Sequence, residues 1–209
     1  MKIRVDNFSK KLGMEQVLDD INVTFESGNS YGIIGANGCG KTMLLRAICG
    51  FIKPDSGGVY VDNKLIGEKN NEYLNNVGII IGEVDFYPDL SGIDNLRLLA
   101  NIKKKINDND IELILQKVGL FEAKDRKYRK YSLGMKQRLR IAQALMEKED
   151  ILILDEPFNG LDKKGTEEIR QLIKENAEGK LLIMTSHNEK DIEILCDSII
   201  TMDGGKIIE

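Results

Sequence analysis

The chain has 209 residues, a length that suits one α/β domain able to bury a sizeable hydrophobic core. Its formal net charge is -4, and because acidic and basic residues are interleaved along the chain, the sequence predicts no basic face for nucleic acid. The longest apolar runs, such as 79–81 and 151–154, are far shorter than the roughly 20 residues that cross a bilayer, so the chain itself is not expected to span a membrane.

The first predicted elements are strands of an antiparallel flank. Apolar residues alternate with polar ones at 3–5 and again at 21–25, on either side of the turn-forming Gly13. A third short strand is predicted at 59–61, ahead of a polar turn. The alternation indicates strands with one buried and one exposed face.

A buried strand, a glycine-rich loop and a helix follow one another within this first region. The apolar run 31–34 leads directly into Gly35. Apolar residues with helical spacing over 41–49 then end at Gly50, which stops the helix.

The second half of the chain predicts helices followed by buried strands. Residues 94–128 are charged with a helical period and indicate an inserted helical lobe. An amphipathic helix is predicted from Met135 to about Glu147, and apolar strands are predicted at 151–154 and 181–184. The end of the chain, 199–208, has the pattern of a hairpin.

The glycine-rich loop satisfies the phosphate-loop pattern and lies between a strand and a helix, as that pattern requires. Its glycines let backbone N–H groups approach phosphate oxygens, and the helix adds the positive end of its dipole. Lys41 should reach the β and γ phosphates of ATP, and Thr42 should offer its hydroxyl to Mg²⁺. The strand and helix argue against an ordinary glycine turn with a chance lysine. The expected nucleotide contacts are Gly35, Asn37, Gly38, Cys39, Gly40, Lys41 and Thr42.

Two carboxylates, Asp155 and Glu156, follow a predicted strand that is apolar on both faces and therefore buried in a parallel sheet. Ligands bind at such strand ends. Asp155 suits a water-mediated partner of Mg²⁺, and Glu156 suits the group that polarises the attacking water. The alternative interpretation is a strand whose acidic end simply points into solvent. The presence of the phosphate loop argues against this alternative.

Two further features gain meaning only beside these motifs. His187, the single histidine of the chain, follows the second apolar strand, where its imidazole could approach the γ phosphate. Taken alone, a capping or surface role would be the better interpretation. Ser132 is placed to cap a helix that Gly134 leaves open to close approach, which would make a second anion site. An ordinary capped helix explains the same residues.

The order of these motifs resembles that of an ATP-binding cassette (ABC) ATPase over essentially the whole chain. The matching segments are the phosphate loop, YSLGMKQRL at 131–139, ILILDEP at 151–157, the loop from Asn159 to Asp162, and His187. Leu133, Met135 and Lys136 are similar to a branch of small cassettes that serve exporters, including some for bacitracin and other antimicrobial peptides.

The resemblance implies an α/β fold: a P-loop NTPase (RecA-like) core with a mainly parallel sheet, an N-terminal antiparallel β flank and an inserted helical subdomain. Residues 1–209 would form a single nucleotide-binding domain. The core and the β flank would take 1–82 and 136–209, and the helical subdomain about 83–135.

The resemblance also implies how the chain would work. Two cassettes of the family pair head to tail, so Ser132 and Gly134 would contact the γ phosphate of ATP on a second cassette, of the same or another kind, and Asp162 would help join the two sites. Hydrolysis would use Glu156 and His187 to power a membrane-spanning subunit on a separate chain. The cassette would lie on the cytoplasmic face of the membrane, and three scattered cysteines that suit neither disulfides nor zinc agree with a reducing cytoplasm.

Three positions depart from the family pattern or allow two interpretations. Gly82 stands where a glutamine that touches Mg²⁺ is usual, and Glu83 beside it either replaces that metal contact or is simply solvated. Leu12 stands where an aromatic residue stacks on adenine, which leaves GTP open as well as ATP. Cys39 suits a small slot better than a reactive thiol.

Two other functions compete with a transporter subunit. A soluble cassette ATPase could act on DNA or ribosomes, but this chain has neither a long coiled-coil insert nor a second cassette. A non-hydrolysing regulatory module is the other alternative, and the intact Lys41, Asp155, Glu156 and His187 argue against it.

Overall fold

The small sheet of the fold is antiparallel throughout. The structure is a computed structural model that describes residues 1–68, 71–82 and 85–208. Four strands lie in the order β2-β1-β4-β5: β1 (Lys2–Leu12), β2 (Glu15–Glu26), β4 (Ser56–Val61) and β5 (Lys64–Leu65). The long β1–β2 pair turns at Gly13, whose φ of 60° suits glycine. This sheet confirms the predicted β flank.

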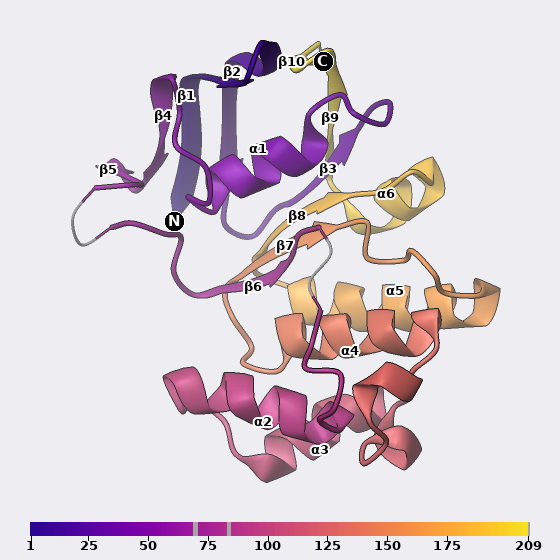
Figure 1. Cartoon of the computed structure of the whole chain (residues 1–209). Coiled ribbons are helices and arrows are strands. Elements are labelled where there is room, and N and C mark those ends of the chain that lie inside the picture. Colours follow the sequence, from indigo (N-terminus) through magenta and orange to yellow (C-terminus); the bar gives the residue numbers. More distant parts are fainter. Residues whose placement is uncertain (69–70, 83–84, 209) are drawn as a thin grey trace.

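The large sheet is mainly parallel, as predicted, and lies at the centre of the molecule (Figure 1). Its order is β10-β9-β3-β8-β7-β6. The strands are β3 (Ser30–Ile34), β6 (Val77–Ile80), β7 (Ile151–Asp155), β8 (Leu181–Thr185), β9 (Ser198–Asp203) and β10 (Lys206–Ile207). Only β10 is antiparallel to its neighbour, in the predicted terminal hairpin. All residues of β8 are buried, which explains its continuous apolar run.

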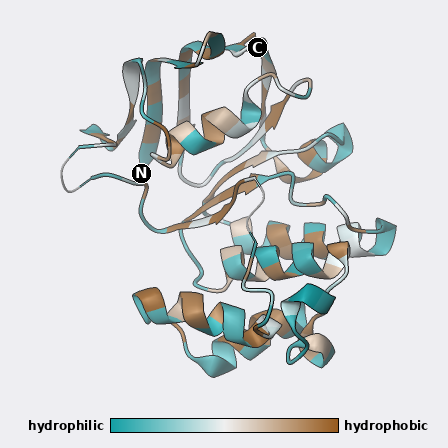
Figure 2. Cartoon of the chain, in the orientation of Figure 1, coloured by the Kyte–Doolittle hydropathy of each residue, from teal (hydrophilic) through white to brown (hydrophobic). Residues whose placement is uncertain are grey.

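Helices cover both faces of the large sheet (Figure 1). Helix α1 (Lys41–Ile48) lies between the two sheets and shares a hydrophobic cluster with both. Helices α4 (Leu133–Leu145), α5 (Lys163–Ala177) and α6 (Glu189–Leu195) cover the opposite face and share the other cluster. Figure 2 shows the central strands coloured mainly as hydrophobic between helices with hydrophilic outer faces. The strand ends that carry the candidate site are therefore rigidly supported.

A helical lobe lies between β6 and α4 in the sequence and below α4 in Figure 1. It contains α2 (Gly92–Lys103), α3 (Asp108–Lys117) and the 3₁₀ turns η1 (Phe121–Ala123) and η2 (Tyr128–Lys130). Both long helices begin at side-chain caps, because Ser91 accepts the Asp94 N–H and Asn107 forms a capping box with Asp110. The lobe and the sheet share one hydrophobic cluster, so the lobe has no separate core.

Acidic residues after α4 fasten the lobe to the core. Glu149 is buried, and its carboxylate contacts the ammonium groups of Lys103 at 2.5 Å and Lys105 at 3.0 Å. Lys103 also contacts Glu147 at 3.2 Å. Hydrogen bonds from the two lysines lower the pKa of Glu149, against the effect of its burial. This charge cluster keeps a buried carboxylate ionised and paired.

Candidate nucleotide site

The phosphate loop joins β3 to α1 in a backbone conformation that only glycine can supply at its ends. Gly35 has a φ of 147° and Gly40 a φ of 108°. A Cβ atom at Gly35 would lie 2.2 Å from the carbonyl oxygen of Met202, and one at Gly40 would lie 2.8 Å from that of Val17. Neither contact is tolerable, because backbone atoms cannot move aside. The loop therefore packs tightly against the chain beneath it.

Lys41 is the first residue of α1 and is only 7% exposed. Its ammonium donates hydrogen bonds to the carbonyl oxygens of Gly35 at 2.6 Å and Ala36 at 3.1 Å. A buried ammonium needs such partners. The loop thus holds a positive charge beside the N-terminus of a helix, which is the environment that favours phosphate.

Two strand ends bring Asp155 against Thr42. The Thr42 hydroxyl donates to Asp155 Oδ2 at 2.7 Å, and the Thr185 hydroxyl donates to Asp155 Oδ1 at 2.8 Å. Asp155 and Thr185 face each other in the β7–β8 register, so the sheet itself sets this arrangement. The Glu156 N–H then donates to Thr185 Oγ1 at 2.9 Å. Thr185 has a supporting role that sequence reasoning missed.

These oxygens suit Mg²⁺ bound together with phosphates. Among the described residues, no group of three or more histidine, cysteine or acidic side chains could hold a metal alone. Mg²⁺ typically takes one or two protein ligands and completes its shell with water and substrate phosphates. The Thr42 hydroxyl and the Asp155 carboxylate, 2.7 Å apart, provide that kind of partial shell beside Lys41.

Glu156 follows β7 with a left-handed backbone, φ 50°, and a side chain that is 16% exposed. Burial raises the pKa of Glu156, and the charge of Asp155 adds to the increase, while His187 and Lys41 oppose it. Its Oε2 accepts the His187 N–H at 3.1 Å. Its Oε1 lies 3.1 Å from His187 Nε2, yet this buried atom makes no hydrogen bond. A desolvated carboxylate with a free oxygen has the character of a general base.

The structure places His187 directly against Glu156, a contact that the sequence did not predict. The imidazole is half exposed and follows β8 through Ser186. Its assignment to the γ phosphate stays a prediction.

Ser132 and Gly134, the signature residues predicted to contact ATP on a second cassette, lie at the N-terminus of α4. Ser132 caps this helix, because its Oγ accepts the Met135 N–H at 3.2 Å. The helix therefore begins at Leu133, two residues before the predicted start. Leu133 is 68% exposed. Ser132 and Gly134 are thus presented on a surface, with their proposed ligand contacts still to be tested.

The loop from Asn159 to Asp162 packs against this helix end. A Cβ atom at Gly160, where φ is 79°, would lie 2.6 Å from Leu133 Cγ. Asp162 caps α5 by accepting the Gly165 N–H at 2.8 Å. The contact between Leu133 and Gly160 links the two segments within one chain.

Of the positions that depart from the family pattern or allow two interpretations, Leu12 and Cys39 lie among the described residues. Glu83 lies outside the described residues, so its proposed metal contact remains a prediction. Leu12 is half exposed at the end of β1. Cys39 is buried under the phosphate loop, and its Sγ would lie 2.8 Å from a Cβ atom at Gly35. This placement agrees with a residue that fills a small slot.

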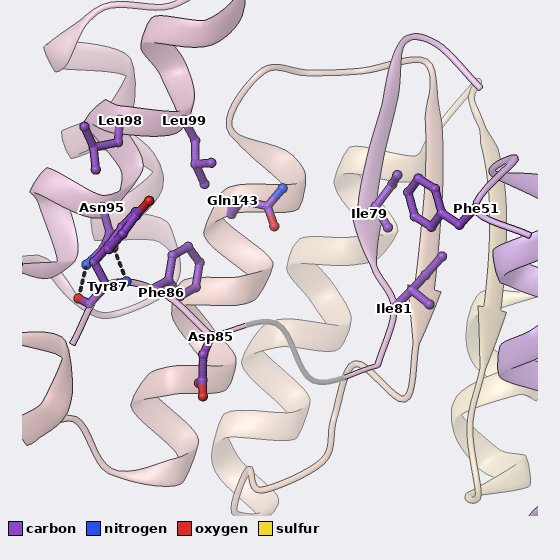
Figure 3. A pocket seen from close by; sticks show the side chains of 10 residues that line it. All are labelled: Phe51, Ile79, Ile81, Asp85, Phe86, Tyr87, Asn95, Leu98, Leu99 and Gln143. Carbon is purple, nitrogen blue, oxygen red and sulfur yellow. Dashed lines mark hydrogen bonds between the residues drawn. The ribbon is translucent and has the colours of Figure 1, made fainter. Parts of the chain in front are cut away.

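An apolar groove, not anticipated from the sequence, separates the lobe from the core (Figure 3). It has a volume of about 310 Å³. Phe51, Ile79 and Ile81 lie on one side, Leu98 and Leu99 on the other, and Phe86 and Gln143 between them. The buried Asn95 side chain holds one wall, because it accepts the Tyr87 N–H at 2.8 Å and donates to the Tyr87 carbonyl at 3.1 Å. The groove could not be predicted from the sequence. Its clearest sign is that the apolar residues Phe51, Tyr87 and Leu98 are exposed, and this exposure is known only from the structure.

Together, the strand, phosphate loop, helix and paired carboxylates define a P-loop nucleoside triphosphatase. A family model described as ABC transporter matches residues 18–159. An uncharacterized ABC transporter ATP-binding protein of Bacillus subtilis (strain 168) is 44% identical, over 98% of this chain and 94% of the relative. The chain belongs to the ABC transporter family.

Other relatives and solved structures agree with this assignment. A bacitracin transport ATP-binding protein of Enterococcus faecalis is 36% identical over 99% of this chain and 68% of the relative. A lantibiotic transport ATP-binding protein of Streptococcus pyogenes is 34% identical over 99% and 89%. Dimeric structures of one ABC cassette, including a post-hydrolysis state bound to ADP and Pi, superpose with a TM-score of 0.88 at 25% identity, over 99% of this chain and 97% of theirs. The chain is an ATP-binding cassette ATPase of the transporter type.

Proposed function

We propose that this chain hydrolyses ATP with Glu156 as the base, as the peripheral subunit of a membrane exporter. The observation that carries the proposal is the Glu156 carboxylate: it is desolvated, one oxygen makes no hydrogen bond, and it lies at the strand end beside Asp155 and His187. A desolvated carboxylate with an oxygen that makes no hydrogen bond is suited to accept a proton from a water molecule.

The remaining residues of the strand end have complementary roles. Lys41 would donate to the β and γ phosphates in place of the loop carbonyls, and the loop N–H groups would bind the other oxygens. Mg²⁺, held by Thr42 and through water by Asp155, would neutralise phosphate charge. Glu156 would orient a water and take its proton as the water oxygen bonds to the γ phosphorus. The bond to the β–γ bridging oxygen breaks, releasing ADP and phosphate.

A second cassette would complete each site. Ser132 and Gly134 lie on an exposed helix end, and one solved cassette that resembles this chain is dimeric. A helix N-terminus attracts anions, so the Ser132 end of α4 would cover the γ phosphate bound by the other cassette. Asp162, at the start of α5, would lie near the same interface.

The apolar groove would receive the membrane-spanning subunit. No helix among the described residues is both long and apolar enough to cross a bilayer. The groove is lined by residues 85–87, which follow β6, and because β6 and β7 are parallel, the carboxyl end of β6 lies at the same sheet edge as Asp155. A cytoplasmic segment of the partner seated there would sense movements of the lobe. The names of the bacitracin and lantibiotic relatives support export of an antimicrobial peptide as the transport task.

The test of the base is Glu156→Gln in the full chain. Steady-state ATP turnover should fall by at least about 100-fold, because general base catalysis contributes on that order, and ATP-bound dimers should accumulate in size-exclusion chromatography. Glu178→Gln, which changes an exposed carboxylate just after α5, should keep parental turnover. Parental turnover in Glu156→Gln would remove the residue from this role.

The test of the partner is purification in mild detergent. The parental chain should bring a membrane protein with it, and Leu98→Glu should abolish this by placing a charge in the groove. Leu113→Glu is the matched control, because Leu113 is similarly exposed on α3 but does not line the groove. Recovery of nucleic acid or ribosomes in place of a membrane protein would instead favour a soluble cassette ATPase.

A further inference from the structure

Arg170 on α5 and Asp191 on α6 form a buried ion pair beneath the strand end that carries the ATP site. Arg170 is 8% exposed and Asp191 is 2% exposed. The Arg170 Nε donates to Asp191 Oδ1 at 3.1 Å, and Nη2 donates to the same oxygen. Two donors from one planar guanidinium converge on this oxygen and hold it in place.

The other oxygen of this carboxylate is directed at the loop that holds His187. Ser186 donates its hydroxyl to Asp191 Oδ2 at 3.3 Å, and the Ser186 Oγ accepts the Asn188 N–H at 3.1 Å. Both neighbours of His187 in the sequence are therefore tied to Asp191, one directly and one through the serine. The His187 N–H itself donates to Glu156.

Arg170 also contacts the segment that follows Glu156. Its guanidinium carbon lies 5.9 Å from the centre of the Phe158 ring, within cation–π distance. The two segments that place Glu156 and His187 against each other thus rest on the same buried side chain. Simple packing of α5 on α6 would need neither the serine link nor the aromatic contact.

We propose that Asp191, oriented by Arg170, is a positioning residue that holds His187 against Glu156 through the Ser186 hydroxyl. The inference rests on the proposed role of His187 in hydrolysis. An ion pair of this kind contributes little net stability, because desolvation of two charges offsets their attraction. Its contribution here is geometric. Because the Asp191 carboxylate is fixed, the 186–188 loop can form its hydrogen bonds in only one arrangement.

The decisive variant is Ser186→Ala, which cuts the link and leaves the buried ion pair intact. We expect the turnover number of the full chain with Mg²⁺ and ATP to fall about tenfold, since misplacement of a catalytic group by about 1 Å can cost up to about 100-fold. The KM for ATP should stay within about twofold, because the phosphate loop is untouched. Glu167→Gln is the matched control: Glu167 also pairs with Arg170 but is exposed, and among the described residues it makes no hydrogen bond or ion pair with the 186–188 loop. It should leave turnover unchanged.

A second measurement does not depend on turnover. His187 is the single histidine of the chain, so isotope labelling of histidine at ring carbon Cε1 gives one signal in an NMR spectrum. That signal should shift or broaden in nucleotide-free Ser186→Ala and stay in place in Glu167→Gln.

The double variant with His187→Ala distinguishes a failure of the positioning role from a failure of the proposed role of His187. If Asp191 acts through His187, Ser186→Ala should lower turnover less than about twofold in the His187→Ala background, because residues that act as a unit are not additive. A full tenfold loss in that background, or an unmoved ring signal in Ser186→Ala, would overturn the positioning role while leaving the proposed function intact. Parental turnover in His187→Ala itself would overturn the assigned role of His187, and the positioning role with it.

Discussion

The two halves of the proposed ATP site are built in opposite ways. The phosphate-loop half is held by hydrogen bonds within the chain. Lys41 is buried and donates to loop carbonyls, and Asp155 accepts hydrogen bonds from the hydroxyls of Thr42 and Thr185. The signature half is presented outward, with Leu133 exposed at the start of α4. A half fixed by its own chain can bind nucleotide alone. The half that lies on the surface would need a second chain before it contacts nucleotide, as proposed for Ser132 and Gly134.

The largest expected effect is a loss of ATP binding in the phosphate-loop half, whereas a change in the signature half should affect only turnover. Lys41→Ala should weaken ATP binding to the isolated chain by about 100-fold, because charge-assisted hydrogen bonds contribute about 1.5–3 kcal/mol. Ser132→Ala should leave this binding unchanged and lower turnover at chain concentrations that allow pairing. Fluorescent-nucleotide titration and ATPase assays on both variants provide the measurements. Equal loss of binding in both would mean that the two halves are not separate.

A smaller effect concerns the stability of the phosphate-loop half. Burial raises the pKa of Glu156, so the folded chain holds that proton to higher pH than the unfolded chain does. Stability from this group is present below the ordinary value of 4.5 and is lost as pH rises through the raised pKa. Glu156→Gln should therefore stabilise the nucleotide-free chain by about 0.5–2 kcal/mol at pH 8, and by less at pH 4.5.

Urea unfolding of the parent and Glu156→Gln at the two pH values measures this difference. Glu178→Gln, at an exposed position, should stay within about 0.5 kcal/mol of the parent at both. A stabilisation by Glu156→Gln that shrinks as pH rises would contradict the desolvation argument.

The smallest effect is expected in the signature half. Leu133→Ala should change the stability of the isolated chain by only about 0.5 kcal/mol, because the side chain is already exposed. Leu139→Ala, six residues further along the same helix and 0% exposed, should cost about 2–5 kcal/mol. Thermal or urea unfolding of both variants tests the comparison. A large loss for Leu133→Ala would show that the helix end is part of the folded core.

Sequence reasoning worked where a local pattern dictates a local structure. The order of strand, glycine loop and helix placed Lys41 correctly at a helix start, and the apolar run at 151–154 placed Asp155 at the end of a buried strand. Parallel strands end at one edge of the sheet, which explains why these segments could be predicted to meet.

It failed where a role depends on packing between distant segments. Thr185 supports Asp155 only through the β7–β8 register, which no single motif encodes. Arg170 and Asp191 look like ordinary surface charges of two amphipathic helices until those helices are packed together. The groove beside Phe86 also arises between segments far apart in the chain.

The contact between Leu133 and Gly160 has a consequence for kinetics. Gly160 follows Glu156 by only a few residues, so the helix end that would serve the ATP of a neighbour presses on the loop leading from the chain's own base. In a head-to-tail pair, nucleotide bound at one site would therefore influence the base of the other site. Hydrolysis should then show positive cooperativity in ATP, with a Hill coefficient above that of independent sites. Trimming Leu133 to alanine should return the curve towards a simple hyperbola.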